Sequence, residues 1–222
     1  MSIQSNIQNI RQFIPSDVKL VCVSKYHPNE AIEEAYSCGE RVFGESKVQE
    51  MCGKYETLPK DIEWHFIGHL QSNKIKSIVP FVSLIHGVDS FKLLTEINKY
   101  AEKANKKVNC LLQVHIAQEE TKFGFSEREL IEVLSGNEWE NLKNVQICGL
   151  MGMATFSNSE NQVRAEFKTL KNLFTKLKAD FFPTEDSFKE ISMGMSADFK
   201  LAIDEGSSMV RIGSSIFGNR IY

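Results

Sequence analysis

Short apolar strands alternate with amphipathic helices along this 222-residue chain, and this alternation limits the possible folds more than any other feature. The pattern predicts strands at residues 20–23, 41–44, 63–68, 83–88, 108–116, 145–151, 190–193 and 208–212. It predicts helices between them at residues 28–37, 45–53, 71–79, 90–104, 126–134, 159–178 and 197–204. Parallel strands need a long crossover, usually a helix, so this repeat at this length predicts a (β/α)₈ TIM barrel.

An extra helix is expected before the first strand, because helical spacing joins Ile3, Ile7, Ile10 and Ile14. A capping box, in which a serine is followed three residues later by a glutamate, marks the start of the helix at residues 126–134. The weakest prediction is the strand at residues 190–193, whose approach has no clean period. A doubly wound open sheet is the alternative to a barrel.

Composition indicates one large core and a cytoplasmic setting. The chain is 42% hydrophobic and no linker-like segment divides it, so residues 1–222 are interpreted as one domain. Its first residues lack a basic region followed by an apolar stretch, and no segment approaches about 18 apolar residues, so export and membrane insertion are not expected. The five cysteines include no Cys-x-x-Cys pair and are expected to be reduced.

Charge and motif content exclude two further classes. The net charge is −3 and no long basic run occurs, so neither nucleic acid nor an anionic membrane is an expected partner. The chain also lacks the Gly-x-x-x-x-Gly-Lys and Gly-x-Gly-x-x-Gly loops that bind nucleotides.

The two loops that follow the last two predicted strands are small and polar. Barrel enzymes often bind phosphate there, through backbone N–H groups and hydroxyls. The first loop is Met193-Gly-Met-Ser196, in which Ser196 is expected to cap the next helix, and the second is Gly213-Ser-Ser215. Either loop alone could be an ordinary turn, but together they indicate an anion site.

Two cationic residues accompany these loops. Lys25 ends the first predicted strand and Arg211 lies in the last, so a closed barrel makes their strands neighbours. A lysine in this position is usually a solvated charge, and an arginine could pair with a carboxylate. A partly desolvated amine can instead form an imine with an aldehyde, and a guanidinium suits a ring nitrogen. The amine, the ring-nitrogen donor and the phosphate loops together fit pyridoxal 5′-phosphate.

Histidines provide a possible metal site. His65, His86 and His115 fall near the carboxyl ends of adjacent predicted strands. No carboxylate accompanies them at ligand spacing, and hydrogen-bonded barrel histidines are more common than metal ligands. The prediction is therefore that no metal binds.

Several motifs identify a family. The chain resembles the pyridoxal phosphate homeostasis proteins, which are single-domain relatives of the N-terminal barrel of alanine racemase. The motifs span nearly the whole chain: Val-Ser-Lys25, Phe43-Gly-Glu45, Trp64-His-Phe-Ile-Gly68-His-Leu-Gln-Ser-Asn-Lys74, Gly149-Leu-Met151, Met193-Gly-Met-Ser196, Met209-Val-Arg-Ile-Gly213 and Ile216-Phe-Gly218. The resemblance implies that Lys25 is the Schiff-base lysine and Arg211 the partner of the pyridine nitrogen. It also implies that the phosphate ligands are Ser196, Gly213 and Ser214.

The resemblance extends to other cofactor residues and has two departures. It implies that His65 lies near the cofactor, and that Lys122 helps to transfer or retain it. The family usually has asparagine after Phe-Gly-Glu, where this chain has Ser46, and asparagine in the fifth strand, where this chain has His115. Both changes alter the hydrogen-bonding groups expected around the cofactor ring.

Two functions remain open. A racemase needs an acid or base on each face of its substrate, and alanine racemase takes its second base from a separate C-terminal domain that this sequence does not show. An arginine at the ring nitrogen also makes the ring a poor electron sink. The preferred interpretation is a cofactor-binding protein, not an enzyme, that takes part in intracellular vitamin B6 homeostasis by storing pyridoxal phosphate or delivering it to apo-enzymes. It would be a monomer or weak dimer. The alternative is a weak amino-acid racemase that uses His65, His115 or a water molecule as second base.

Overall fold

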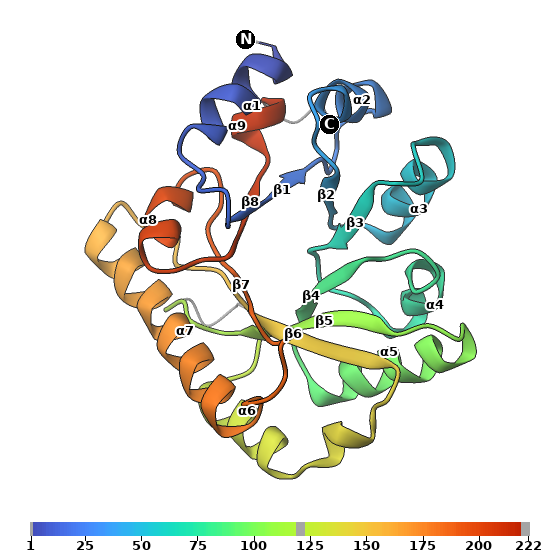
Figure 1. Ribbon diagram of the computed structural model, residues 1–222, viewed down its shortest axis with the longest axis vertical. Coiled ribbons are helices and arrows are strands. Elements are labelled where there is room, and N and C mark those ends of the chain that lie inside the picture. The colour runs from blue at the N-terminus through green and yellow to red at the C-terminus, as the bar shows by residue number, and fades with distance from the viewer. Residues whose placement is uncertain (1, 119–122, 219–222) are drawn as a thin grey trace.

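The chain forms a closed barrel of eight parallel strands in a computed structural model that describes residues 2–118 and 123–218 (Figure 1). The strands follow one another around the barrel in chain order: β1 Lys19–Val23, β2 Val42–Glu45, β3 Glu63–Phe66, β4 Leu84–Val88, β5 Val108–Val114, β6 Val145–Gly152, β7 Glu190–Ser192 and β8 Met209–Ile212. Closure depends on β1 and β8, which pair from Lys19 with Met209 to Cys22 with Ile212. The predicted barrel is confirmed and the open sheet is wrong.

Helices surround the strands on the outside of the barrel (Figure 1). They are α1 Ile3–Arg11, α2 Asn29–Ser37, α3 Val48–Thr57, α4 Ile75–Ile78, α5 Phe91–Lys103, α6 Glu127–Ser135, α7 Glu160–Asp180, α8 Phe199–Asp204 and α9 Ser214–Phe217, with 3₁₀ turns at Ser72–Lys74 and Glu138–Asn141. In the described ranges, none of these helices has the length and apolar content to cross a membrane.

The extra N-terminal helix is confirmed as α1, which lies against α9 beside the end of β8 (Figure 1). Its isoleucines Ile7 and Ile10 are buried, and the Asn6 side chain donates a hydrogen bond from Nδ2 to the Ile216 carbonyl at 2.8 Å. The first helix therefore supports the segment that follows the last strand.

Helix boundaries differ from prediction where glycine or tertiary packing intervenes. The helix predicted at residues 45–53 is α3, which begins at Val48 and continues past Gly53 to Thr57. It continues because an exposed glycine in a helix costs stability without breaking the hydrogen-bond ladder. The segment at residues 71–79 is a 3₁₀ turn followed by the single short helix α4. The capping box is confirmed, since the Ser126 hydroxyl accepts from Glu129 N and the Glu129 carboxylate accepts from Ser126 N.

The core of the described residues consists of two clusters of buried apolar side chains. A small cluster of apolar side chains comprises Val21, Leu84, Leu111, Cys148, Met151 and Met209, with members on β1, β4, β5, β6 and β8. The larger cluster includes residues of both the strands and the helices, such as Phe43, Trp64 and Phe167. All five cysteines are free thiols.

A bulge in β6 lies against β7, the strand whose prediction from the sequence was weakest. The register between β5 and β6 shifts after Cys110, and Gly149 has a positive φ of 147°. A Cβ atom at Gly149 would lie 1.8 Å from the Glu190 carbonyl oxygen on β7. Only glycine allows β7 to approach β6 this closely.

Candidate functional site

The carboxyl ends of the strands bring together most of the residues expected to form the site. In a parallel barrel these ends share one face, where barrel enzymes bind their ligands. His65 lies in β3 and Arg211 in β8, whereas Lys25, Ser196, Gly213 and Ser214 follow strands β1, β7 and β8. Lys122 lies outside the described residues, so its expected role stays a prediction.

Lys25 lies in the turn that follows β1, two residues beyond the end of the strand at Val23, and it is half-buried. Ser24 N donates to the Gly44 carbonyl at 3.1 Å, and His27 N donates to the Ser24 carbonyl at 3.1 Å. Tyr26 has a left-handed backbone with φ 66°, which is strained for a residue other than glycine. A Cβ atom on Gly213 would lie 3.1 Å from the Val23 carbonyl, so the turn adjoins the loop after β8 as predicted.

Arg211 is a buried cation held by neutral acceptors. Its Nη1 donates to the carbonyl and the hydroxyl of Ser192 at 2.8 and 2.6 Å, and its Nη2 donates to the Gly152 carbonyl at 3.1 Å. Burial lowers the pKa of Arg211 to about 10. The charge of Asp198 favours the guanidinium, although no described carboxylate lies within ion-pair distance of it. These hydrogen bonds use three of the five N–H donors of a guanidinium. The remaining donors can serve a ligand acceptor.

A chain of hydrogen bonds runs from Arg211 to His65. His86 Nδ1 lies 3.0 Å from the Ser192 hydroxyl, and His86 Nε2 lies 3.0 Å from His65 Nδ1. Because Ser192 Oγ already accepts from Arg211, its own proton serves His86 Nδ1 in the simplest assignment. His86 Nε2–H then donates to His65 Nδ1, and the His65 proton lies on Nε2.

His65 and His86 are both neutral near pH 7. Burial lowers the pKa of His65 to about 3 and the pKa of His86 well below its ordinary range, and the charge of Arg211 lowers the latter further. They are therefore suited to donate and accept fixed hydrogen bonds and are poor proton carriers. Within residues 2–118 and 123–218 no group of three or more histidine, cysteine or acidic side chains is arranged to hold a metal ion.

The loops after β7 and β8 meet at Ser196. Its hydroxyl oxygen accepts from Gly213 N at 3.2 Å and from Ser215 N at 3.5 Å. The expectation that Ser196 caps α8 is wrong: the N-cap is Asp198, whose carboxylate accepts from Met195 N and closes that turn. Ser214 is exposed at the start of α9. Two backbone N–H groups thus converge on one hydroxyl, an arrangement that suits an anion. Sequence reasoning did not single out Ser215.

A buried ion network beside the Lys25 turn was also missed. Lys54 Nζ donates to Glu45 Oε1 at 2.8 Å and to Glu50 Oε1 at 2.6 Å. Burial raises the pKa of Glu45 to about 7, although the Lys54 ammonium and the Ser24 hydroxyl both favour its carboxylate. Two sequence signals were present: Glu50 and Lys54 are spaced four residues apart on a helix, and Glu45 ends the motif Phe43-Gly-Glu45.

The two departures from the expected motifs are half-buried positions next to β2 and β5. Gly68 packs directly on Ser46, since a Cβ atom there would lie 2.4 Å from the Ser46 carbonyl. His115 N donates to the Phe125 carbonyl at 2.9 Å, which joins the end of β5 to the segment before α6. The backbone at both positions is fixed by neighbouring loops.

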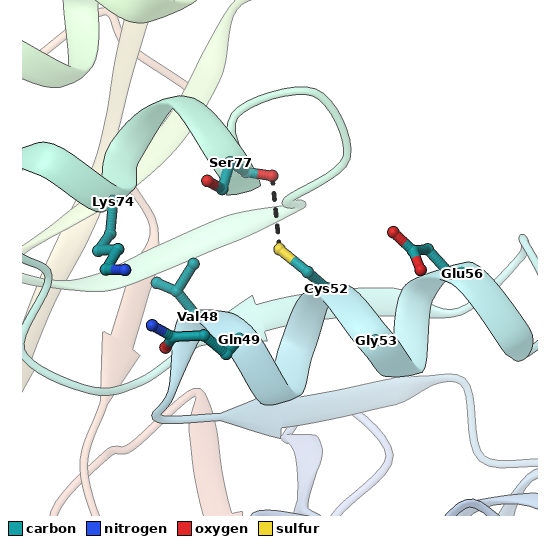
Figure 2. A pocket seen from close by; sticks show the side chains of 7 residues that line it. All are labelled: Val48, Gln49, Cys52, Gly53, Glu56, Lys74 and Ser77. Carbon is teal, nitrogen blue, oxygen red and sulfur yellow. Dashed lines mark hydrogen bonds between the residues drawn. The ribbon is translucent and has the colours of Figure 1, made fainter.

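A separate groove lies on the outside of the barrel, between α3 and the segment formed by the 3₁₀ turn Ser72–Lys74 and α4 (Figure 2). It encloses about 390 Å³ and is lined by Val48, Gln49, Cys52, Gly53, Glu56, Lys74 and Ser77. The Cys52 thiol donates to the Ser77 carbonyl at 3.7 Å across it (Figure 2). None of the expected site residues lines this groove.

Comparisons with known proteins agree with this geometry. The family model described as "Alanine racemase, N-terminal domain" matches residues 1–220. A pyridoxal phosphate homeostasis protein of Aquifex aeolicus is 42% identical over 205 residues, which cover 92% of this chain and 88% of that protein. PipY of Synechococcus elongatus has been solved without PLP (TM-score 0.92, 35% identity) and with PLP bound (TM-score 0.87, 34% identity). Each match covers 98% of this chain and 100% of PipY. The chain therefore belongs to the pyridoxal phosphate homeostasis protein family, whose barrel is that of the alanine racemase N-terminal domain.

Proposed function

We propose that this protein binds pyridoxal 5′-phosphate at the carboxyl end of its barrel and takes part in keeping the intracellular supply of this cofactor. Lys25 would attach it, Arg211 would face its ring nitrogen, and Ser196, Gly213 and Ser214 would hold its phosphate. When bound, the cofactor supplies an aldehyde that condenses with a primary amine, whose nitrogen becomes double-bonded to the aldehyde carbon while the carbonyl oxygen leaves as water.

The buried Arg211 is the observation that carries this proposal. A guanidinium removed from water is costly unless its donors meet acceptors, and Arg211 has donors left after its bonds to Ser192 and Gly152. A ring nitrogen is an acceptor that one of these remaining N–H donors could reach. The N–H groups of Gly213 and Ser215 offer an anion site on the adjoining loop.

The chemistry of the same site favours binding over catalysis. Arg211 keeps its proton at neutral pH even with its lowered pKa of about 10, so it does not readily protonate a ring nitrogen. His65, one candidate for a second base, is neutral and hydrogen-bonded to His86. The weak-racemase alternative then depends on His115 or a water molecule.

Storage of the cofactor in the cytoplasm and its delivery to apo-enzymes belong to the same proposal, as do a single domain over residues 1–222 and a monomeric or weakly dimeric state. The naming of relatives as homeostasis proteins supports the storage role. Lys122 would help to transfer or retain the cofactor.

The test is the site of covalent attachment. Purified protein is incubated with pyridoxal phosphate, reduced with borohydride and mapped by peptide mass. We expect the reduced adduct on Lys25 and its loss in Lys25→Ala, with an unchanged fold because a lysine in a turn buries little apolar surface. Lys168→Ala, on the exposed face of α7, is the control and should keep the adduct. An adduct that remains as the main species in Lys25→Ala would refute the assignment.

A further inference from the structure

We infer that Glu45, Glu50 and Lys54 are positioning residues that clamp the turn carrying Lys25 and so set the orientation of its amine. This inference rests on the proposed attachment at Lys25. None of the three was expected to take part in the site, and they act on the residues on either side of Lys25.

The residue before Lys25 is held from two directions. The Ser24 hydroxyl donates to Glu45 Oε1 at 2.6 Å, and the Ser24 carbonyl accepts from Lys54 Nζ at 2.9 Å. Glu45 is the last residue of β2 and Lys54 lies in α3, so the turn after β1 is tied to the neighbouring strand and to its helix.

Tyr26, the residue after Lys25, is held by Glu50. Tyr26 N donates to Glu50 Oε1 at 2.6 Å, and Tyr26 has the strained φ of 66°. Such a conformation persists only where the surroundings fix it. The Lys47 ammonium also lies 4.6 Å from the centre of the Tyr26 ring, which adds a second contact to the same residue.

Lys54 joins the two ends of the clamp. Its ammonium has three donors, and these reach the Ser24 carbonyl, Glu45 and Glu50. All three are charge-assisted or buried bonds, which hold their geometry better than exposed ones. Removing one partner therefore affects the backbone on both sides of Lys25.

The consequence is kinetic and specific to the amine. Reaction of an amine with an aldehyde depends on alignment, and a displacement of about 1 Å can cost as much as ~100-fold in rate. The groups proposed to hold the ring and phosphate lie on β8 and the loops after β7 and β8, outside the clamp. Loss of the clamp should slow attachment and leave non-covalent binding nearly intact.

The experiment compares full-length Glu50→Ala with Glu50→Gln, which keeps an oxygen acceptor for Tyr26 N. The rate of attachment is followed by the absorbance change on adding pyridoxal phosphate and by mass after reduction. Non-covalent affinity is measured with pyridoxine 5′-phosphate, which has the ring and phosphate but no aldehyde. The control is Glu205→Ala: the Glu205 side chain is 22% exposed and paired with Arg164, and that of Glu50 is 21% exposed and paired with Lys54.

We expect Glu50→Ala to slow attachment by ~10- to ~100-fold, with affinity for pyridoxine 5′-phosphate within about threefold of the unsubstituted protein. Glu50→Gln should recover most of the rate, and Glu205→Ala should match the unsubstituted protein. An unchanged rate in Glu50→Ala, or equal loss of rate and affinity, would overturn the clamp. Failure of the unsubstituted protein to form any Lys25 adduct would instead overturn the proposed function.

Discussion

His86 shows how one buried residue links the site to the stability of the barrel. It is fully enclosed between His65 and Ser192, and burial lowers its pKa well below the ordinary 6.5. In the unfolded chain the same histidine takes up a proton below about pH 6.5, whereas in the folded protein it does not. The unfolded state therefore gains protons first, and the free energy of unfolding falls as pH falls below that value. Glu45, whose pKa is raised to about 7, has the opposite effect between its ordinary value of 4.5 and 7.

We predict that His86→Gln reduces the acid sensitivity of the apo-protein. Glutamine keeps hydrogen-bonding groups and cannot be protonated in this range. Between about pH 7.5 and about pH 5, the variant should lose about 2 kcal/mol less stability than the unsubstituted protein. The figure corresponds to the ~1.5 pH units between the ordinary histidine pKa of about 6.5 and pH 5, at ~1.4 kcal/mol per pH unit. Urea unfolding at the two pH values measures this difference. Equal losses in both proteins would show that His86 is not held neutral.

At the scale of elements, glycines have opposite roles in a strand and in a helix. Gly149 has a positive φ, and a Cβ atom there would overlap the Glu190 carbonyl of the adjacent strand. Gly53 lies in α3, and a Cβ atom there would meet no atom within 4 Å. The first glycine is required by the packing of β6 on β7, whereas the second is only tolerated.

We predict that Gly149→Ala destabilises the protein by at least about 3 kcal/mol, because β7 must move away from β6. Gly53→Ala should stabilise it by about 0.5–1 kcal/mol, since alanine loses less conformational entropy in a helix. Denaturant midpoints of the two variants and the unsubstituted protein provide the comparison. A mild effect of Gly149→Ala would mean that the strands can separate without cost.

At the scale of the whole molecule, the barrel places Lys25, a candidate base, at the same face as a buried guanidinium and a neutral histidine pair. Racemisation needs proton transfer on both faces of a substrate and a ring that withdraws electrons. Arg211, Ser192, His86 and His65 are linked by hydrogen bonds, an arrangement that favours ligand binding over proton transfer.

We predict that the cofactor-loaded protein racemises alanine, serine and glutamate far below the ~1–10³ s⁻¹ typical of enzymes. Chiral analysis after long incubation, with Lys25→Ala in parallel, measures this directly. Many turnovers that disappear in Lys25→Ala would establish an enzyme. Transfer of cofactor to an apo-enzyme without turnover would support the carrier role.

The repeat of strands and helices, the extra first helix and the adjacency of the first and last strands were all predictable. These features depend on local periodicity and on the rule that parallel strands need crossovers, both of which can be read from neighbouring residues. The bulge at Gly149 and the start of α3 at Val48 were not predictable, because packing between elements decides them.

The sequence by itself determined the barrel, its family and the identity of the residues expected at its mouth. Only the tertiary structure decided how those residues are held. Arg211 is 19 residues from Ser192, and Ser192 is 106 residues from His86, so no local pattern could join them. The hydrogen bond from Gly213 N to the Ser196 hydroxyl and the clamp formed by Lys54 have the same cause. Buried polar groups must find partners, and in a closed barrel those partners come from other strands and helices.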